Sequence, residues 1–153
     1  MKELELNLDQ IKEYQQNRHP YLFVDYIEKL IPGKLSNGFK MLLEDEWFFK
    51  VHWPGDPNMP GMLQVEALVQ TSALALTCLP DNKGKLVYLV SANKLKFIKK
   101  ILPGNKLILN TIIKDYKRGI ANVEGKAFVD GTLACSADFK IIMPDELNKY
   151  KIK

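Results

Sequence analysis

The sequence is poor in the residues that build disulfides and metal centres, with two cysteines and two histidines among 153 residues. Two cysteines do not form the disulfide framework of a small secreted protein, so Cys78 and Cys135 are predicted to be reduced core residues of a cytoplasmic protein. Neither histidine belongs to a metal-ligand cluster, and the sequence has no glycine-rich phosphate loop and no nucleotide-binding fingerprint. We therefore expect no metal site and no cofactor.

The sequence also lacks a recognisable targeting or membrane segment. Residues 1–5 are charged and do not have the apolar core of a signal peptide. Residues 61–79 are long enough to suggest a membrane span, but polar side chains there argue against insertion: Gln64, Glu66, Gln70, Thr71 and Ser72. The sequence predicts no membrane insertion and a cytoplasmic location.

An excess of basic over acidic residues gives the chain a formal net charge of +4. The basic residues alternate with core residues along expected strands and match no nucleic-acid motif, so we expect no nucleic-acid partner. Two interpretations remain open: the lysines guard a solvated sheet edge, or they form a basic rim that attracts an acidic partner. The clusters are Lys94, Lys96, Lys99 and Lys100, and Lys114, Lys117 and Arg118.

The length and an ordinary composition, 46% hydrophobic and 26% charged, indicate one domain over residues 1–153 without repeats or a linker. One long apolar helix among five or six mostly antiparallel strands predicts an α+β fold, in which the sheet curls around the helix. The polar tail at residues 145–153 is expected to be loosely held. The expected helices span residues 8–16 and 61–79, and the expected strands span residues 22–31, 35–43, 86–98, 106–116, 120–129 and 132–142.

The chain is organised around residues 47–79, which combine a stiff loop with the apolar helix. Three prolines and two glycines within residues 54–61 exclude helix and ladder pairing there. The helix from Gly61 to Leu79 is apolar on almost every face, which is typical of a buried helix. Its only carboxylate is Glu66, whose pKa should be raised by burial. Such a group can donate and accept protons at cellular pH.

His52 lies on the stiff loop just before the helix, so His52 and Glu66 are the parts of a two-group proton-transfer site. Simpler interpretations stand beside this one. A loop histidine next to a tryptophan is usually only packed or solvated. Gln70 lies one helical turn after Glu66, on the same helix face, and a simple hydrogen bond to that acid would explain its presence.

Residues 52–61 read His-Trp-Pro-Gly-Asp-Pro-Asn-Met-Pro-Gly, and residues 65–70 read Val-Glu-Ala-Leu-Val-Gln. This pattern resembles the active-site signature of the bacterial 3-hydroxyacyl-[acyl-carrier-protein] dehydratases of type II fatty acid synthesis. The histidine and the glutamate are 66 − 52 = 14 residues apart, which is the same interval as in that family. The resemblance extends over residues 17–143. Val51 and Trp53 depart from the family's usual glycine and phenylalanine, so a dehydratase of a specialised acyl or polyketide pathway remains an alternative.

The resemblance implies a hotdog fold and the dehydration of a (3R)-3-hydroxyacyl-[acyl-carrier-protein] to the trans-2-enoyl product. It assigns His52 to the proton at C2 and Glu66 to the leaving hydroxyl at C3. Gly61 opens the helix, where an unpaired backbone N–H at the positive end of the helix dipole is the natural donor to the thioester oxygen. A plain helix start after Pro60 explains the same glycine, and both interpretations can hold together.

The resemblance also implies a tunnel for the acyl chain. Tyr88 matches a gating tyrosine of the family, although packing in the strand core explains it equally well. Phe97 is a further candidate for substrate binding, and Tyr21 and Phe23 are candidate walls. The implied partners are an acidic acyl carrier protein with a phosphopantetheine-linked chain and further copies of this chain. In the resembled family, two hotdog units join edge to edge as a homodimer with shared active sites, and such dimers commonly assemble into hexamers.

Two other functions remain open at this point. A hotdog thioesterase would use a carboxylate to activate water, and it would leave the loop of His52 unexplained. A non-catalytic acyl-binding or scaffold subunit would be favoured by loss of the histidine or of Glu66, and both are present.

Overall fold

The structure, a computed structural model, describes residues 2–152 of the chain. A 7-stranded antiparallel sheet has the order β1-β2-β3-β5-β6-β7-β4. The strands are β1 (Leu4–Leu6), β2 (Tyr26–Ile31), β3 (Leu35–Met41), β4 (Tyr88–Phe97), β5 (Lys106–Lys117), β6 (Ile120–Val129) and β7 (Thr132–Ile142). The helices are α1 (Leu8–Tyr14), α2 (Trp47–Val51), α3 (Gly61–Thr77) and α4 (Pro144–Asn148).

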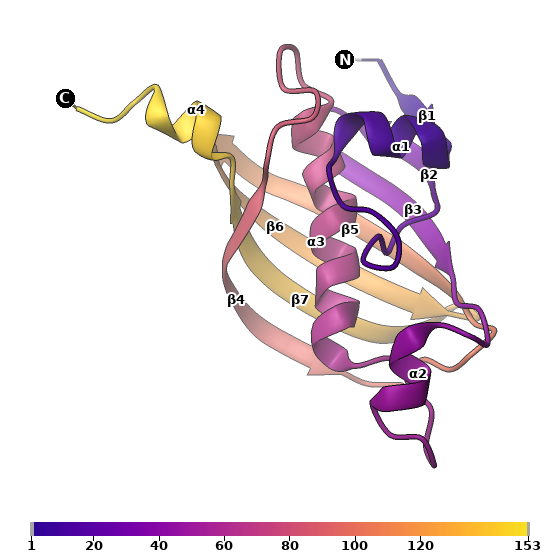
Figure 1. The fold of residues 1–153 in the computed structure, drawn as a ribbon. Helices are drawn as coiled ribbons and strands as arrows, with labels where there is room; N and C mark the ends of the chain where they lie inside the picture. The colour runs from indigo at the N-terminus through magenta and orange to yellow at the C-terminus, as the bar shows by residue number, and fades with distance from the viewer. Residues whose placement is uncertain (1, 153) are drawn as a thin grey trace.

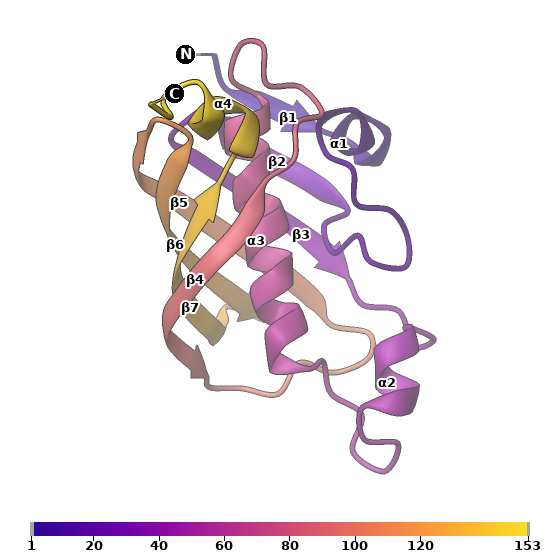
Figure 2. The same ribbon diagram turned by 60° about the vertical axis from the view of Figure 1, so that its left-hand side comes forward.

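Helix α3 lies across the inner face of the curved sheet in both ribbon views (Figure 1 and Figure 2). From residue 64 to residue 77 every residue is buried except Glu66, which is half-buried. The all-round apolar pattern explains this position, because a helix without a polar face is stable only when it is covered. Within residues 2–152, neither α3 nor any other helix combines the length and apolarity that crossing a bilayer demands. The predicted α+β arrangement, an antiparallel sheet wrapped around one long central helix, is confirmed.

Two tight hairpins set the register of β5, β6 and β7. Asp130 and Gly131 have positive φ angles of 49° and 75°, as the predicted type I′ turn requires. Arg118 and Gly119 form an equivalent turn, with φ angles of 54° and 82°. Strand β6 pairs along its length with both neighbours, so the middle of the sheet is fully paired behind α3.

The structure corrects the prediction of a loop throughout residues 47–61, because its first residues form α2. Phe48 and Phe49 are buried and turn this segment into the core. The N-cap residue of α2, Glu46, makes no side-chain cap bond, so the helix has no capping signal in the sequence. Tertiary burial therefore decides its conformation.

Other boundaries also differ from the predicted ones. The short strand β1 raises the number of strands above the five or six expected. The predicted strand at residues 22–31 becomes regular only at Tyr26, because residues 22–24 are buried beside α3 instead. Only the start of the tail is held more firmly than expected: it forms α4, where the Glu146 carboxylate accepts a hydrogen bond from the Lys85 ammonium at 2.9 Å. Residues 148–152 are exposed, and residue 153 lies outside the described residues.

Strand β4 forms one edge of the sheet and is exposed along most of its length. An edge strand presents unpaired backbone N–H and C=O groups, which can pair with a strand of another chain. Large apolar side chains accompany this open edge: Tyr88, Leu89, Val90, Phe97 and Ile98 are all exposed.

Candidate active site

The loop that carries His52 is fixed at several points. Helix α2 ends at this residue. Farther along the loop, the Met59 N–H donates to the Ile101 carbonyl at 2.8 Å. The Lys100 ammonium bonds both oxygens of the Asp56 carboxylate, at 2.9 and 2.7 Å. Together with the prolines, these contacts define the position of the histidine.

One ring nitrogen of His52 contacts the backbone of its own loop. Its Nδ1 lies 3.1 Å from the carbonyl oxygen of Asn58. Because a carbonyl only accepts hydrogen bonds, Nδ1 carries the hydrogen, and the neutral ring keeps its lone pair on Nε2. The Trp53 ring stacks on the imidazole with centroids 5.1 Å apart and an interplanar angle of 15°. The departure from phenylalanine at this position therefore enlarges a surface that orients the histidine.

Gly61 begins α3 close to an aromatic ring. The carbonyl of Pro60 accepts hydrogen bonds from the N–H groups of Leu63 and Gln64, at 3.0 and 3.1 Å. The Gly61 N–H precedes these bonds and has no acceptor inside the helix. A Cβ atom at Gly61 would lie 2.9 Å from Cε1 of Phe97, closer than side chains tolerate. The glycine is therefore needed for this contact, and its N–H lies at the positive end of the helix dipole.

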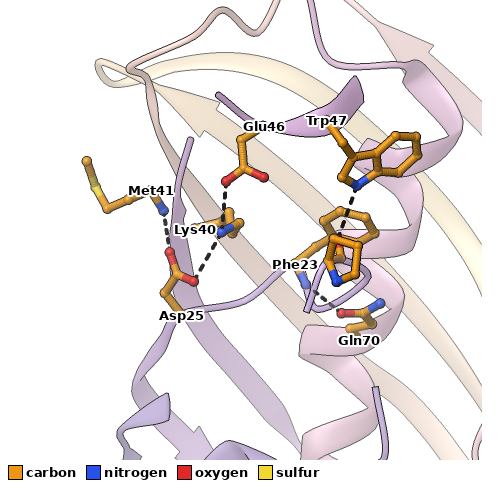
Figure 3. A network of polar contacts seen from close by, with 8 residues as sticks. Phe23, Asp25, Lys40, Met41, Glu46, Trp47 and Gln70 are labelled. Carbon is orange, nitrogen blue, oxygen red and sulfur yellow. Dashed lines mark hydrogen bonds and ion pairs between the residues drawn. The ribbon is translucent and has the colours of Figure 1, made fainter. Parts of the chain in front are cut away.

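Glu66 is held by Gln70, one turn later on α3. The Nε2 of Gln70 donates to Oε1 of Glu66 at 2.9 Å and to the carbonyl of Tyr21 at 2.9 Å. Its Oε1 accepts from the Phe23 N–H at 2.8 Å, as Figure 3 shows. Since the backbone fixes both ends of this amide, Gln70 always presents an N–H to the acid. The predicted bond from Gln70 to the acid is present, and it also ties the acid to the segment before β2.

The surroundings of Glu66 favour its protonated form. Burial raises the pKa of Glu66 above the ordinary value of a glutamic acid, and the hydrogen bond from Gln70 opposes part of this rise. Burial, followed by the charge of Glu66, also raises the pKa of Tyr21. Burial raises the pKa of the free thiols of Cys78 and Cys135 to about 12 and about 11. Neither cysteine is therefore a thiolate nucleophile at neutral pH.

His52 and Glu66 are not brought to one cavity within the single chain. Glu66 lines a groove of about 360 Å³, which Tyr88 also lines. Gly61 and Phe97 line a different hollow of about 450 Å³, where the stiff loop meets α3. Glu66 and Tyr88 therefore border one hollow, Gly61 and Phe97 border another, and His52 lines neither of the two.

The predicted substrate-binding residues differ in exposure. Tyr88 is 51% exposed, so its interpretation as a strand-core residue is wrong. Phe97 is 49% exposed, and Tyr21 is 44% exposed. Phe23 is fully buried in the core and is not a groove wall. Gln15, which also lines the groove, has no signal in the sequence, because only the packing of the segment after α1 brings it there.

A partly buried ion cluster joins the start of α2 to the sheet (Figure 3). The ammonium of Lys40, on β3, lies 3.3 Å from the carboxylates of both Asp25 and Glu46. Next to it, the Trp47 Nε1–H donates to the carbonyl of Pro20 at 3.2 Å. These contacts hold the helix that ends at the histidine.

A family profile described as "FabA-like domain" matches residues 16–138 of this chain. The chain belongs to the FabA-like family. This FabA-like protein is 41% identical over 144 residues to the 3-hydroxyacyl-[acyl-carrier-protein] dehydratase FabZ of Alkaliphilus metalliredigens, with 93% of this chain and 98% of that protein covered. It is 36% identical over 139 residues to the protein of the same name from Syntrophomonas wolfei, with 91% and 96% covered.

Solved structures define the fold of this FabA-like chain. The dehydratase heterocomplex ApeI:P from Xenorhabdus doucetiae matches it with a TM-score of 0.76 at 13% identity, covering 91% of this chain and 95% of that chain. A hypothetical thioesterase from Streptococcus pneumoniae matches with a TM-score of 0.60 at 14% identity, covering 76% and 83%. At such identities the similarity establishes the fold alone, and this fold is the hotdog fold that the sequence resemblance implies.

Proposed function

We propose that His52 and Glu66 together remove water from a 3-hydroxyacyl thioester. The family supports the reaction class: the chain is a hydro-lyase that dehydrates 3-hydroxyacyl-[acyl-carrier-protein] in fatty acid biosynthesis. One observation carries the residue assignment, namely the half-buried Glu66 with a raised pKa and a fixed amide donor. Such an acid holds a proton nearer to neutral pH than an exposed glutamate does.

The reaction needs a base at C2, an acid at the C3 hydroxyl and a donor at the carbonyl oxygen. Nε2 of His52 takes the C2 proton, and the bond electrons move into the thioester carbonyl to form an enolate. The Gly61 N–H stabilises the oxygen of this enolate. Glu66 gives its proton to the hydroxyl, which leaves as water while the C2–C3 double bond forms. The imidazolium then returns a proton to the carboxylate through solvent, which restores both groups.

In this proposal the two groups come from different copies of the chain. The groove of Glu66 and the hollow of Gly61 are separate within one copy, which supports a site that a second copy completes. The open edge of β4, with its exposed apolar side chains, is the surface for a second copy. Pairing of β4 with the same strand of a second chain would bury this edge. Hexamers of such dimers remain an expectation from the family resemblance.

An acidic acyl carrier protein is the proposed donor of the thioester. Lys99 and Lys100 line the hollow of Gly61, and Lys94 and Lys96 extend the basic surface along β4. Basic side chains around a substrate entrance attract an acidic partner over long range.

Lys99 is the sharper probe of this docking role, because Lys100 is already paired with Asp56. Lys99→Glu should raise the KM for carrier-bound substrate more than the KM for a pantetheine thioester, and added salt should reduce the difference. Lys29→Glu, an exposed residue of β2, serves as the control. Equal increases for both substrates in Lys99→Glu would argue against carrier docking at this surface.

Ultraviolet absorbance of a crotonyl thioester tests the reaction class. A dehydratase working in reverse adds water and bleaches the conjugated band, a thioesterase releases free thiol, and a scaffold does neither. We expect bleaching without thiol release. His52→Ala and Glu66→Gln should each lower kcat/KM by roughly 10²- to 10⁴-fold, the usual contribution of a general acid or base. Near-normal activity in either folded variant would remove that residue from the mechanism.

A further inference from the structure

Helix α3 buries two glutamines, and only one of them has partners for both ends of its amide. Gln64 is 4% exposed and Gln70 is 2% exposed. The Gln70 amide donates to two acceptors, and its oxygen accepts from a backbone N–H. The Gln64 amide donates to a backbone carbonyl, but its Oε1 has no hydrogen-bond donor within residues 2–152. A buried acceptor without a donor is unfavourable, so this oxygen calls for a partner.

The orientation of the Gln64 amide is fixed by its contact with the stiff loop. Its Nε2 donates to the carbonyl of Met59 at 2.8 Å. Because a carbonyl only accepts hydrogen bonds, the nitrogen faces Met59, and Oε1 lies on the other side of the planar amide. The Met59 N–H is itself bonded to the Ile101 carbonyl at 2.8 Å, so this anchor is held in place. The tie between loop and helix explains the nitrogen of Gln64 and leaves its oxygen unexplained.

Gln64 lines the same hollow as Gly61, the hollow of about 450 Å³ at the start of α3. The two residues are three positions apart, which is about 4.5 Å along the helix axis. Helical side chains lean toward the N-terminus, so the Gln64 amide turns back toward the Gly61 end of the helix. Its bond to Met59, which precedes Gly61, agrees with this direction. The hollow therefore combines a backbone donor, the Gly61 N–H, with a side-chain acceptor, Oε1 of Gln64.

The thiol part of the proposed substrate carries an N–H that suits this acceptor. In every pantetheine thioester an amide nitrogen lies two carbons from the sulfur. Five bonds separate that nitrogen from the thioester oxygen, which allows a span of roughly 5 Å at ordinary bond lengths. This span matches the axial separation of Gly61 and Gln64, about 4.5 Å. A thioester whose oxygen is bound at Gly61 can therefore reach Gln64 with its amide.

We propose that Oε1 of Gln64 accepts a hydrogen bond from the pantetheine amide nearest the thioester. The inference rests on the proposed function, because it places the thioester oxygen at the Gly61 N–H. It makes Gln64 a specificity residue for the thiol side of the substrate, on the far side of the carbonyl from the acyl chain. The contact is consequently independent of the length of that chain.

Two matched small thioesters test the proposal on the wild-type protein. S-crotonyl-N-acetylcysteamine carries the amide N–H, and the crotonyl thioester of 2-mercaptoethyl acetate has an ester oxygen in its place. The measured quantity is kcat/KM for hydration, followed by ultraviolet absorbance. We expect the amide substrate to be favoured by about tenfold, because the ester leaves Oε1 unpaired and brings a second oxygen toward it. Equal kcat/KM values for the two substrates would overturn the proposal without any variant.

Substitutions then assign the preference to the oxygen of Gln64. Gln64→Met is similar in length but has no strong acceptor, so the amide-to-ester ratio should fall below about threefold. Gln64→Glu keeps an acceptor oxygen and should retain most of the preference. Gln10→Met makes the first change on the exposed face of α1 and serves as the control. A disturbed loop would lower both activities together, whereas loss of the amide contact lowers only the activity toward the amide substrate.

The outcomes separate this inference from the proposed function. If the wild-type protein hydrates neither thioester, the proposed function fails. If it hydrates both and Gln64→Met keeps the wild-type ratio, the function stands and the amide is recognised elsewhere. Loss of the preference in both Gln64→Met and Gln64→Glu would assign it to the tie with Met59 instead of the oxygen. An equal loss in Gln10→Met would also overturn the assignment.

Discussion

At the scale of a single residue, the partly buried Glu66 carboxylate destabilises the folded protein at neutral pH. Burial raises its pKa in the folded state, so the folded protein holds this proton more tightly than the unfolded chain does. Its contribution to the free energy of unfolding is therefore most favourable below the unfolded pKa. That contribution falls as the pH rises through the unfolded value toward the raised folded value. The property that suits an acid catalyst thus costs stability at neutral pH.

Glu66→Gln should therefore stabilise the protein while it removes activity. The amide keeps an oxygen that can accept the hydrogen bond from Gln70 and carries no charge to desolvate. We expect the free energy of unfolding at pH 7 to rise by on the order of 1 kcal/mol. The gain should become small at about pH 4, where a glutamate is mostly protonated even in the unfolded chain. Urea denaturation at both pH values measures the change.

The control for this prediction is Glu28→Gln, an exposed residue of β2. Exposed carboxylates without a buried environment contribute little, so this variant should show no pH-dependent gain. A Glu66→Gln protein that is no more stable than wild type at pH 7 would contradict the claim that burial of the Glu66 carboxylate destabilises the folded protein.

Local spacing allows the sequence to predict Glu66, Gln70 and Gly61 as neighbours on one helix. It does not predict Gln15, because this residue reaches the groove only through the packing of α1 against the end of α3. Long-range packing of this kind leaves no periodic pattern in the sequence. The arrangement of these three residues on one helix is therefore accessible from the sequence, whereas the position of Gln15 in the groove is not.

At the scale of elements, α3 and α2 show why some structure is predictable and some is not. The predicted helix at residues 61–79 is confirmed with its end at Thr77, since termini vary by one or two residues between definitions. Helix α2 is one short turn without a side-chain cap, held by the burial of Phe48 and Phe49. Tertiary contacts decide such a segment, and intrinsic propensity does not.

The ion cluster that anchors α2 gives a prediction for this element. Lys40→Met would leave Asp25 and Glu46 next to each other without their shared cation. Removing the cation leaves two carboxylates close together in a partly buried place, so we expect the free energy of unfolding to fall by about 2 kcal/mol. Urea denaturation measures the change.

A second variant separates loss of the cation from loss of packing. Lys40→Met combined with Glu46→Gln removes one of the unpaired charges and should recover part of the stability. Lys29→Met, which breaks an exposed pair with Glu3 at 3.7 Å, should change stability by less than about 1 kcal/mol. Equal losses in Lys40→Met and Lys29→Met would show that the cluster has no special role in holding α2.

At the scale of the whole molecule, α3 covers the inner face of the sheet, whereas the edge formed by β4 has no partner strand on its outer side within the described residues. The sequence indicates the need for a partner, because a single curled sheet leaves an edge and apolar flanks uncovered. It does not indicate which residues two copies would share, since that depends on the geometry of an assembled dimer. The groove of Glu66 and the hollow of Gly61 are separate in one copy, and this separation is the reason to test whether two copies share a site.

Mixed dimers test whether the active site is shared. His52→Ala and Glu66→Gln homodimers should each be inactive, but co-refolding the two variants should restore activity. In a mixed dimer with shared sites, one site receives both intact groups and the other receives neither. Half of the dimers are mixed on random assortment, so activity should approach roughly a quarter of the wild-type value, as two-fold symmetry requires. If each site lay within one chain, no mixed dimer would hold an intact site. Absence of recovered activity, with subunit exchange established by native mass spectrometry, would therefore exclude the shared site and leave both groups to act within a single copy.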